Sequence, residues 1–301
     1  MVQTRNIFKG TGVAIVTPFH NDDSIDFKSL SNLVNFQIEN KVDYLVVLGT
    51  TGESVTISND EKKAIINTVI GTTNKRVPIV VGIGGNNTQD IINKIRTFDF
   101  TGVDAILSVS PYYNKPSQAG IYEHYKIIAS ISPVPIIIYN IPGRTGSNVS
   151  AETTLKLAHD FKNIIATKEA SGNLQQIMQI IKNKPDNFEV ISGDDALALP
   201  LISIGGIGVI SVIANAFPRH MSEMINNALK GNYERARELN YAMIDMIGLL
   251  FAECSPSGIK AALEIKKLCT SHVRLPLVKV SDSLYQKINE ATKLLDSYSI
   301  K

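Results

Sequence analysis

Lys168 interrupts a short apolar run, residues 164–170, whose β-branched residues predict a buried strand. A buried lysine requires a partner, access to solvent or a chemical role. A desolvated amine loses its proton more readily and can attack a ketone to form a Schiff base. The alternative is an amine that extends from the strand end into water. The run by itself leaves both interpretations open.

Other reactive groups follow three more apolar runs. Thr50 and Thr51 stand between glycines, where backbone N–H groups can hold a carboxylate and hydroxyls can pass a proton. Tyr113 follows a second run, and Tyr139 and Arg144 lie at the end of a third. Singly, these residues are typical of capping turns, packed rings and surface charges. Together they supply a nucleophile, proton-relay hydroxyls and a carboxylate clamp.

The elements expected to position these residues alternate between short β-branched runs and longer stretches of helical period. Eight such strand-helix units predict an α/β fold, a (β/α)8 TIM barrel in which the carboxyl ends of the strands surround one cavity. The predicted strands are 12–19, 44–49, 79–84, 105–110, 135–141, 164–170, 189–194 and 208–215.

Beyond residue 231 the strand pattern stops. Residues 233–251, 255–270 and 280–298 predict three helices, with Gly231 ending the preceding helix and Asn232 capping the next. We therefore expect a catalytic barrel over residues 1–231 and a small C-terminal helical domain over residues 232–301.

The composition is that of an ordinary globular chain of 301 residues, with 44% hydrophobic residues, 19% charged residues and a formal net charge of +2. No long basic block favours nucleic acid or an anionic membrane, so we expect a small molecule or another copy of the chain as partner. Residues 1–8 lack the pattern of a signal peptide, and no apolar stretch approaches about 20 residues, which favours a cytoplasmic enzyme.

Metal and disulfide chemistry are not indicated. Cys254 and Cys269 form no C-x-x-C pair and are expected to be free thiols. The histidines show no metal-ligand spacing, so we expect surface or capping roles and no histidine-based metal site. They are His20, His124, His159, His220 and His272.

Two further motifs lie near predicted strand ends. The glycine-rich stretch 204–208 precedes the last strand and is predicted to be a tight turn at the structural face of the barrel, not a phosphate loop. Gly193, Asp194 and Asp195 follow strand seven on the catalytic face. Of their two possible roles, shaping the cavity or capping the next helix, we favour capping.

Four motifs give the chain a resemblance to a known family, in order along the sequence from about residue 10 to the final helix. The chain resembles the 4-hydroxy-tetrahydrodipicolinate synthases, also called dihydrodipicolinate synthases, within the pyruvate-dependent class I aldolases that include N-acetylneuraminate lyase. The motifs are 49–53 (GTTGE), 111–116 (PYYNKP), 139–146 (YNIPGRTG) and 168–172 (KEASG).

The resemblance implies a role for each matching catalytic residue. Lys168 would form the imine with pyruvate, and Tyr139 would move protons during imine formation and cyclisation. Thr50 and Tyr113 would complete the relay, with Tyr113 reaching in from a neighbouring subunit of a tight dimer.

The resemblance also implies the substrate contacts. Thr50 and Thr51 would hold the pyruvate carboxylate, and Arg144 would receive the carboxylate of aspartate semialdehyde, for which a planar guanidinium is well suited. The carbonyl of Ile210 and the glycine at Gly193 would border the substrate.

The implied reaction is the Schiff-base condensation of pyruvate with L-aspartate 4-semialdehyde to 4-hydroxy-tetrahydrodipicolinate, the first committed step of lysine and diaminopimelate biosynthesis. It would need no metal or cofactor, because the iminium is the electron sink. The family also implies a homo-oligomer, a tetramer built from tight dimers, and no nucleic-acid or membrane partner.

Two alternatives remain at this stage. One is a pyruvate lyase acting on a sugar acid such as N-acetylneuraminate or a 2-keto-3-deoxy acid, which would lack the turn that carries Arg144. Turnover of aspartate semialdehyde compared with such acids separates the two. The other is a catalytically silent barrel that senses a keto acid or lysine, which intact Lys168 and Tyr139 argue against.

Many family members are inhibited by L-lysine bound near the dimer interface. Here Asn59 and Lys62 stand where lysine-sensitive bacterial members often carry histidines, and Asp90 replaces a longer glutamate. A cation at Lys62 would oppose the cationic inhibitor at short range. The possible allosteric site comprises Ser54, Asn59, Lys62, Asn86, Asp90 and Tyr112.

We therefore predict weak or absent inhibition of this chain by L-lysine. Initial rates measured over a range of lysine concentrations test this. An inhibition constant in the low micromolar range would contradict it.

Overall fold

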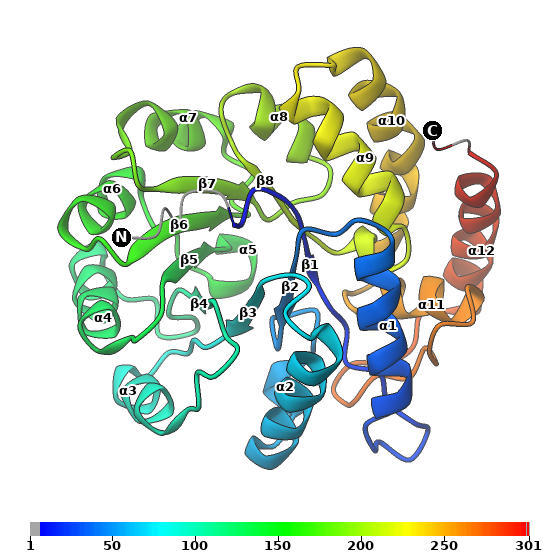
Figure 1. Cartoon of the computed structure of the whole chain (residues 1–301), viewed down its shortest axis with the longest axis horizontal. Helices are drawn as coiled ribbons and strands as arrows, with labels where there is room; N and C mark the ends of the chain where they lie inside the picture. Colours follow the sequence, from blue (N-terminus) through cyan, green and yellow to red (C-terminus); the bar gives the residue numbers. More distant parts are fainter. Residues whose placement is uncertain (1–6, 299, 301) are drawn as a thin grey trace.

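The computed structural model describes residues 7–298 and 300, so residues 1–6 of the segment considered above for a leader lie outside it. Eight parallel strands form a closed barrel in chain order, and β8 pairs with β1 to complete it (Figure 1). The predicted TIM barrel is confirmed. The strands are β1 Gly10–Ala14, β2 Tyr44–Val47, β3 Ile79–Gly82, β4 Ala105–Val109, β5 Ile136–Asn140, β6 Ile164–Glu169, β7 Glu189–Ser192 and β8 Gly208–Ser211.

Alternate strand residues point into the barrel, because successive side chains of a strand face opposite ways. The inner side chains form one apolar cluster, while a second, larger cluster fills the space between the strands and the helices. At the amino end of the barrel, Phe8 packs edge-on against Tyr44, with ring centroids 5.4 Å apart. The inner cluster includes Ala14, Val46, Val80, Leu107, Ile137, Ala166, Ile191 and Ile210.

Most of the helices that cover the barrel begin at a local side-chain cap. The Asp26 side chain accepts the N–H of Ser29 at the start of α1, and Ser58 and Glu61 form a reciprocal capping box at the start of α2. These helices are α1 Phe27–Glu39, α2 Asn59–Thr73, α3 Thr88–Thr97, α4 Gln118–Ile131, α5 Pro142–Thr145, α6 Ala151–Asp160, α7 Leu174–Asn183, α8 Ala198–Ser203 and α9 Pro218–Leu229.

Three helices follow the barrel, as predicted: α10 Tyr233–Phe251, α11 Ser257–Ile265 and α12 Asp282–Ser297. Helix α10 packs against α9 and α12 (Figure 1). Gly231 adopts a left-handed conformation with φ 81°, as expected of a glycine that ends a helix. Asn232 is the N-cap residue of α10, as predicted, but its side chain makes no capping hydrogen bond to this helix, and its amide donates to Asn227 instead.

Most strands end two or more residues before the apolar runs that predicted them. The run 12–19 continues through Ile15, Val16 and Phe19, which are buried although they follow β1. Hydrophobic patterning reports burial and not the ladder of hydrogen bonds, so it extends strands into buried loops. The predicted tight turn at 204–208 is confirmed, with Gly205 at φ 110°.

The expectation of surface histidines is wrong for His124 and His220, which are 4% and 6% exposed, although His220 contacts a carbonyl in the last turn of α12, as a capping residue does. His124 lies on the buried face of α4, where burial lowers its pKa to about 4, and its Nδ1 lies 2.8 Å from the hydroxyl of Thr88. His220 Nε2 lies 3.0 Å from the Leu295 carbonyl.

Both cysteines are free, as predicted. No helix within the described residues is both long and apolar enough to span a membrane.

Gly12 illustrates how tightly the amino end of the barrel is filled. A Cβ built on Gly12 would lie 2.3 Å from the ring of Tyr44, which is fully buried. We expect Gly12→Ala to lower the free energy of unfolding by about 1–3 kcal/mol through overpacking, measured by urea denaturation. The matched control is Gly248→Ala in α10, where a Cβ would meet nothing within 4 Å and a gain of about 0.4–1 kcal/mol is expected. Equal effects of the two changes would contradict this account.

Candidate active site

Lys168 and Tyr139 face each other inside the barrel. They are register partners on β6 and β5, two residues beyond the inner positions Ala166 and Ile137, so both side chains point inward. Lys168 is 5% exposed and Tyr139 is 6% exposed. The Lys168 Nζ lies 4.3 Å from the centroid of the Tyr139 ring, and it makes no hydrogen bond or ion pair within the described residues. The amine therefore lies against the aromatic face of Tyr139 and has no carboxylate partner among the described residues.

Gly193, at the end of β7, provides the space through which the Lys168 side chain passes. A Cβ at Gly193 would lie 2.9 Å from Lys168 Cε and 2.8 Å from Ala170 Cβ. Its backbone N–H donates to the Glu169 carbonyl at 2.7 Å. Any larger residue here would have to displace the lysine.

A cavity of about 550 Å³ opens at the carboxyl ends of β2 to β5. Thr50, Tyr139 and Arg144 line it, so the structure brings these three predicted residues together. Lys168, Thr51, Gly193 and Ile210 do not line it, and Lys168 is connected to it through its contact with Tyr139. Ile210 is 1% exposed within the inner cluster.

The turn that carries the two threonines leaves backbone donors free. The N–H groups of Gly52 and Glu53 donate to the carbonyls of Gly49 and Thr50, at 3.1 Å each. Those of Thr50 and Thr51 have no partner in the described part of the chain. Adjacent free N–H groups of this kind can receive a carboxylate.

Two predicted residues are far more exposed. Tyr113 is 88% exposed, does not line the cavity and has a positive φ of 72°, with its N–H directed to the Thr145 carbonyl at 3.3 Å. Arg144, on the short helix α5, is exposed at the cavity wall, and its Nη2 lies 3.5 Å from the Ser255 carbonyl.

A buried acid behind Lys168 escaped the sequence analysis. Glu169 points away from the barrel interior, accepts hydrogen bonds from Asn140 (3.1 Å) and Ser171 (2.7 Å), and is 1% exposed. Burial raises its pKa to about 7, against the lowering effect of these hydrogen bonds. Asn140 also accepts the N–H of Val149. This network braces the strand ends that carry Tyr139 and Lys168, and the only signal for it was an acidic residue in an apolar run.

The predicted capping role of Asp194 and Asp195 needs correction. The buried Asp195 carboxylate accepts the N–H groups of Val212 and Ile213, at 3.0 and 2.9 Å, where the 3-10 helix η3, Ile213–Asn215, begins after β8. Helix α8, the next along the chain, has no side-chain cap. Burial raises the pKa of Asp195.

Only some residues of the possible lysine site lie at the cavity. Ser54, Asn59, Lys62 and Tyr112 line the cavity, whereas Asn86 and Asp90 do not. Lys94 on α3, which the sequence analysis missed, lines it as well. Burial, followed by the charge of Lys94, lowers the pKa of Lys62.

Across the described residues, no group of three or more histidine, cysteine or acidic side chains could hold a metal ion.

Comparison with known proteins shows which family has this sequence and this fold. The sequence profile described as the Dihydrodipicolinate synthetase family matches residues 7–295. The chain belongs to this family. The 4-hydroxy-tetrahydrodipicolinate synthase of Parabacteroides distasonis is 51% identical over 287 residues, which cover 95% of this chain and 97% of the relative.

Solved structures of family members have the same fold. Dihydrodipicolinate synthase from Aquifex aeolicus superposes with a TM-score of 0.93 at 40% identity, covering 96% of this chain and 98% of that one. The chloride-inhibited enzyme from Acinetobacter baumannii, solved with pyruvate, has a TM-score of 0.93 at 38% identity, covering 96% and 99% of the two chains.

Glu169 gives the family fold a testable pH dependence in this chain. Its folded pKa of about 7 exceeds the ordinary value of 4.5, so the folded protein keeps a proton that the unfolded chain releases. The associated stability is complete below pH 4.5 and is lost as the pH rises through 7. Relative to Glu169→Gln, which cannot ionise, wild-type protein should lose up to about 3 kcal/mol of unfolding free energy across this range.

Urea denaturation at a series of pH values measures this difference. Ser171→Ala keeps the acid and removes a hydrogen bond that lowers its pKa, so it should steepen the loss. A difference between wild type and Glu169→Gln that stays constant with pH would contradict the assignment.

Proposed function

We propose that this chain condenses pyruvate with L-aspartate 4-semialdehyde through an imine on Lys168, giving 4-hydroxy-tetrahydrodipicolinate, the first committed step of lysine and diaminopimelate biosynthesis. It acts as a lyase of the class I aldolase type. Membership in the family and relatives named 4-hydroxy-tetrahydrodipicolinate synthase support this reaction. The main structural support is the position of Lys168. Its buried amine has no carboxylate partner among the described residues and lies against Tyr139, beside a cavity lined by Thr50 and Arg144.

The reaction begins when the neutral amine of Lys168 attacks the pyruvate ketone and water leaves, forming the imine. The iminium withdraws electrons, so the pyruvate methyl group loses a proton and becomes an enamine. The enamine carbon attacks the aldehyde of aspartate semialdehyde and forms the new carbon–carbon bond. The substrate amine then attacks the imine carbon, closes the ring and releases Lys168. No metal or cofactor enters this sequence.

Tyr139 transfers the protons of these steps, with Thr50 as its partner in the relay. Their common position on the cavity wall supports this role. The free N–H groups and hydroxyls of Thr50 and Thr51 hold the pyruvate carboxylate, which the unused donors of the turn support. Gly193 and the Ile210 carbonyl border the substrate.

Arg144 binds the carboxylate of aspartate semialdehyde. Its place at the open wall of the cavity, 3.5 Å from a single backbone carbonyl, leaves most of its donors available to a ligand. A guanidinium pairs with a carboxylate through two parallel hydrogen bonds, which fixes the orientation of the substrate.

We also propose a cytoplasmic homotetramer built from tight dimers, in which Tyr113 completes the proton relay of a neighbouring subunit. The exposed ring of Tyr113 and its positive φ support this role, because a bulky residue in that conformation needs a compensating function. Residues 1–231 would form the catalytic barrel and residues 232–301 the helical domain. Four cavity residues, Ser54, Asn59, Lys62 and Tyr112, would give at most a weak lysine site, because Lys94 adds a second cation.

Borohydride reduction in the presence of pyruvate, followed by intact-mass analysis and peptide mapping, tests the imine. Wild-type protein should gain one reduced pyruvate on Lys168, and Lys168→Met should gain none. Arg144→Ala is the matched contrast. It keeps the amine, so trapping should persist, while condensation with aspartate semialdehyde should fall about tenfold to a hundredfold, as expected when a positioned charged hydrogen bond is lost. Wild-type protein that traps no pyruvate would overturn the mechanism.

A further inference from the structure

The turn that carries Thr50 and Thr51 is held in an unfavourable backbone conformation. Leu48 and Glu53, which flank it, have φ values of 57° and 54°, in the left-handed region that non-glycine residues seldom occupy. Such residues persist where surrounding contacts fix them, and they gather at functional sites. The contacts that fix this turn come largely from the C-terminal part of the chain.

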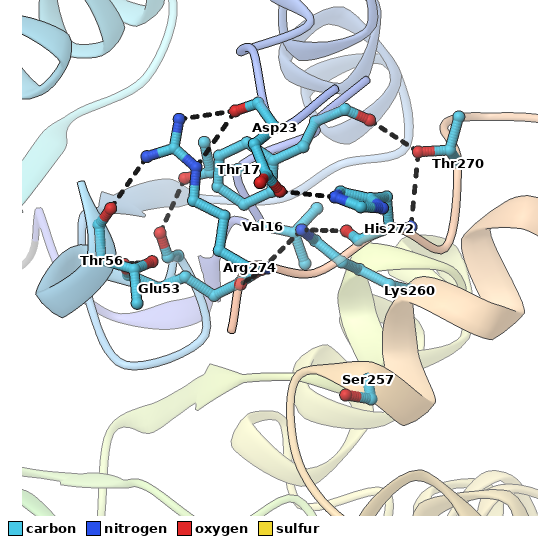
Figure 2. Close-up of polar contacts among 12 residues, drawn as sticks. Val16, Thr17, Asp23, Glu53, Thr56, Ser257, Lys260, Thr270, His272 and Arg274 are labelled. Carbon is cyan, nitrogen blue, oxygen red and sulfur yellow. Dashed lines mark hydrogen bonds and ion pairs between the residues drawn. The ribbon is translucent and has the colours of Figure 1, made fainter. Parts of the chain in front are cut away.

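Glu53 connects the turn to α11. Its carboxylate is buried, and Lys260 Nζ lies 2.5 Å from Oε1, with side chains 0% and 1% exposed (Figure 2). The other carboxylate oxygen accepts the backbone N–H of Arg274 at 3.1 Å. Lys260 also donates to the His272 carbonyl at 2.8 Å. The carboxylate is therefore paired by a helix and by the segment that follows it.

Arg274 holds the chain just beyond the turn. Its Nη1 donates to the Thr56 carbonyl at 2.8 Å, and its guanidinium pairs with Glu61, the capping-box partner of Ser58 in the first turn of α2. This pairing holds the pKa of Glu61 at about 2. The same guanidinium donates to the Asp23 carbonyl (Figure 2).

The loop after β1 forms the other side of this cluster. Thr17 donates to the Gly52 carbonyl at 2.8 Å, directly within the turn. The buried ring of Phe19 lies under both cations, 4.2 Å from Lys260 Nζ and 4.5 Å from Arg274 Cζ. Thr270 donates to the Phe19 carbonyl at 2.6 Å.

A fully buried ion pair is an expensive way to gain stability, because desolvation offsets most of the attraction and apolar residues of similar volume often serve as well. The ion pair instead fixes the orientation of Glu53, because a carboxylate bound by two fixed donors has one preferred orientation. Glu53 is the residue that ends the threonine turn, so fixing its side chain also fixes the end of that turn.

We propose that Lys260 and Arg274 are positioning residues which act through Glu53 to hold the Thr50–Thr51 turn in its carboxylate-binding form. The C-terminal region thus sets the affinity of the barrel for its keto acid. The proposal rests on the function proposed above in one respect, that the ligand of the turn is the pyruvate carboxylate.

The test compares Lys260→Met and Arg274→Gln with Lys184→Met. The control removes a lysine from a different ion pair that is only partly buried, Lys184–Glu189, 2.9 Å apart at the amino end of β7 and so at the far end of the barrel. Steady-state kinetics give KM for each substrate and kcat. Hydrogen–deuterium exchange over residues 49–57 reports the order of the turn independently of activity.

Both test variants should raise KM for pyruvate by about tenfold or more, the scale of a small misplacement of binding groups, with a smaller change in KM for aspartate semialdehyde. Exchange over residues 49–57 should become faster. Arg274→Lys, which keeps the charge but lacks the planar guanidinium, should have an intermediate effect. Lys184→Met should leave KM and this exchange unchanged, whatever its effect on stability.

A folded variant with an unchanged KM for pyruvate and unchanged exchange over residues 49–57 would overturn the assignment of that residue. If Lys260→Met does not fold, Arg274→Gln decides the matter, because its side chain is 15% exposed. Borohydride trapping on wild-type protein is done first. Failure there rejects the proposed function, whereas normal trapping with unaltered variants rejects only the positioning role.

Discussion

Closure of a parallel barrel around a lysine is the constraint on which the rest of this structure depends. The inner side chains of a TIM barrel normally form a packed apolar core. Lys168 occupies an inner position two residues beyond Ala166, so its stem must fit among apolar neighbours while its amine remains near the open end. The aromatic face of Tyr139 and the absence of a side chain at Gly193 make this possible. Both features lie at register positions that the sheet itself aligns.

The strand ends around Lys168 are held from outside the barrel by buried polar groups. Glu169 and Asn140 link β6 to β5, while Asp195 fixes the chain after β8. Lys260 and Glu53 do the same for the turn after β2. Polar groups buried this deeply are costly unless paired, so each pairing selects one arrangement of the loops that it joins.

Patterning predicted what depends on neighbours along the chain. Eight strands, three C-terminal helices and the tight turn at Gly205 follow from hydrophobic period and glycine placement. The ends of strands were less predictable, because Ile15, Val16 and Phe19 are buried without belonging to β1. The role of Asp195 was misjudged for a related reason. A capping residue is normally sought next to its helix in sequence, whereas the N–H groups that Asp195 accepts follow another strand.

The amino-acid sequence was enough to predict which reactive side chains matter, their order along the chain, and the face of the repeating strand-helix fold on which they lie. Those features are encoded within single strands and turns, so local pattern and family motifs carry them. The residues that surround these side chains became known only from the folded structure. Arg274 and Glu53 are bonded across 221 positions, and Lys94 joins Lys62 at one cavity from a separate helix. Contacts of this kind arise when the barrel closes and brings distant segments together, and no local pattern in the chain marks them in advance.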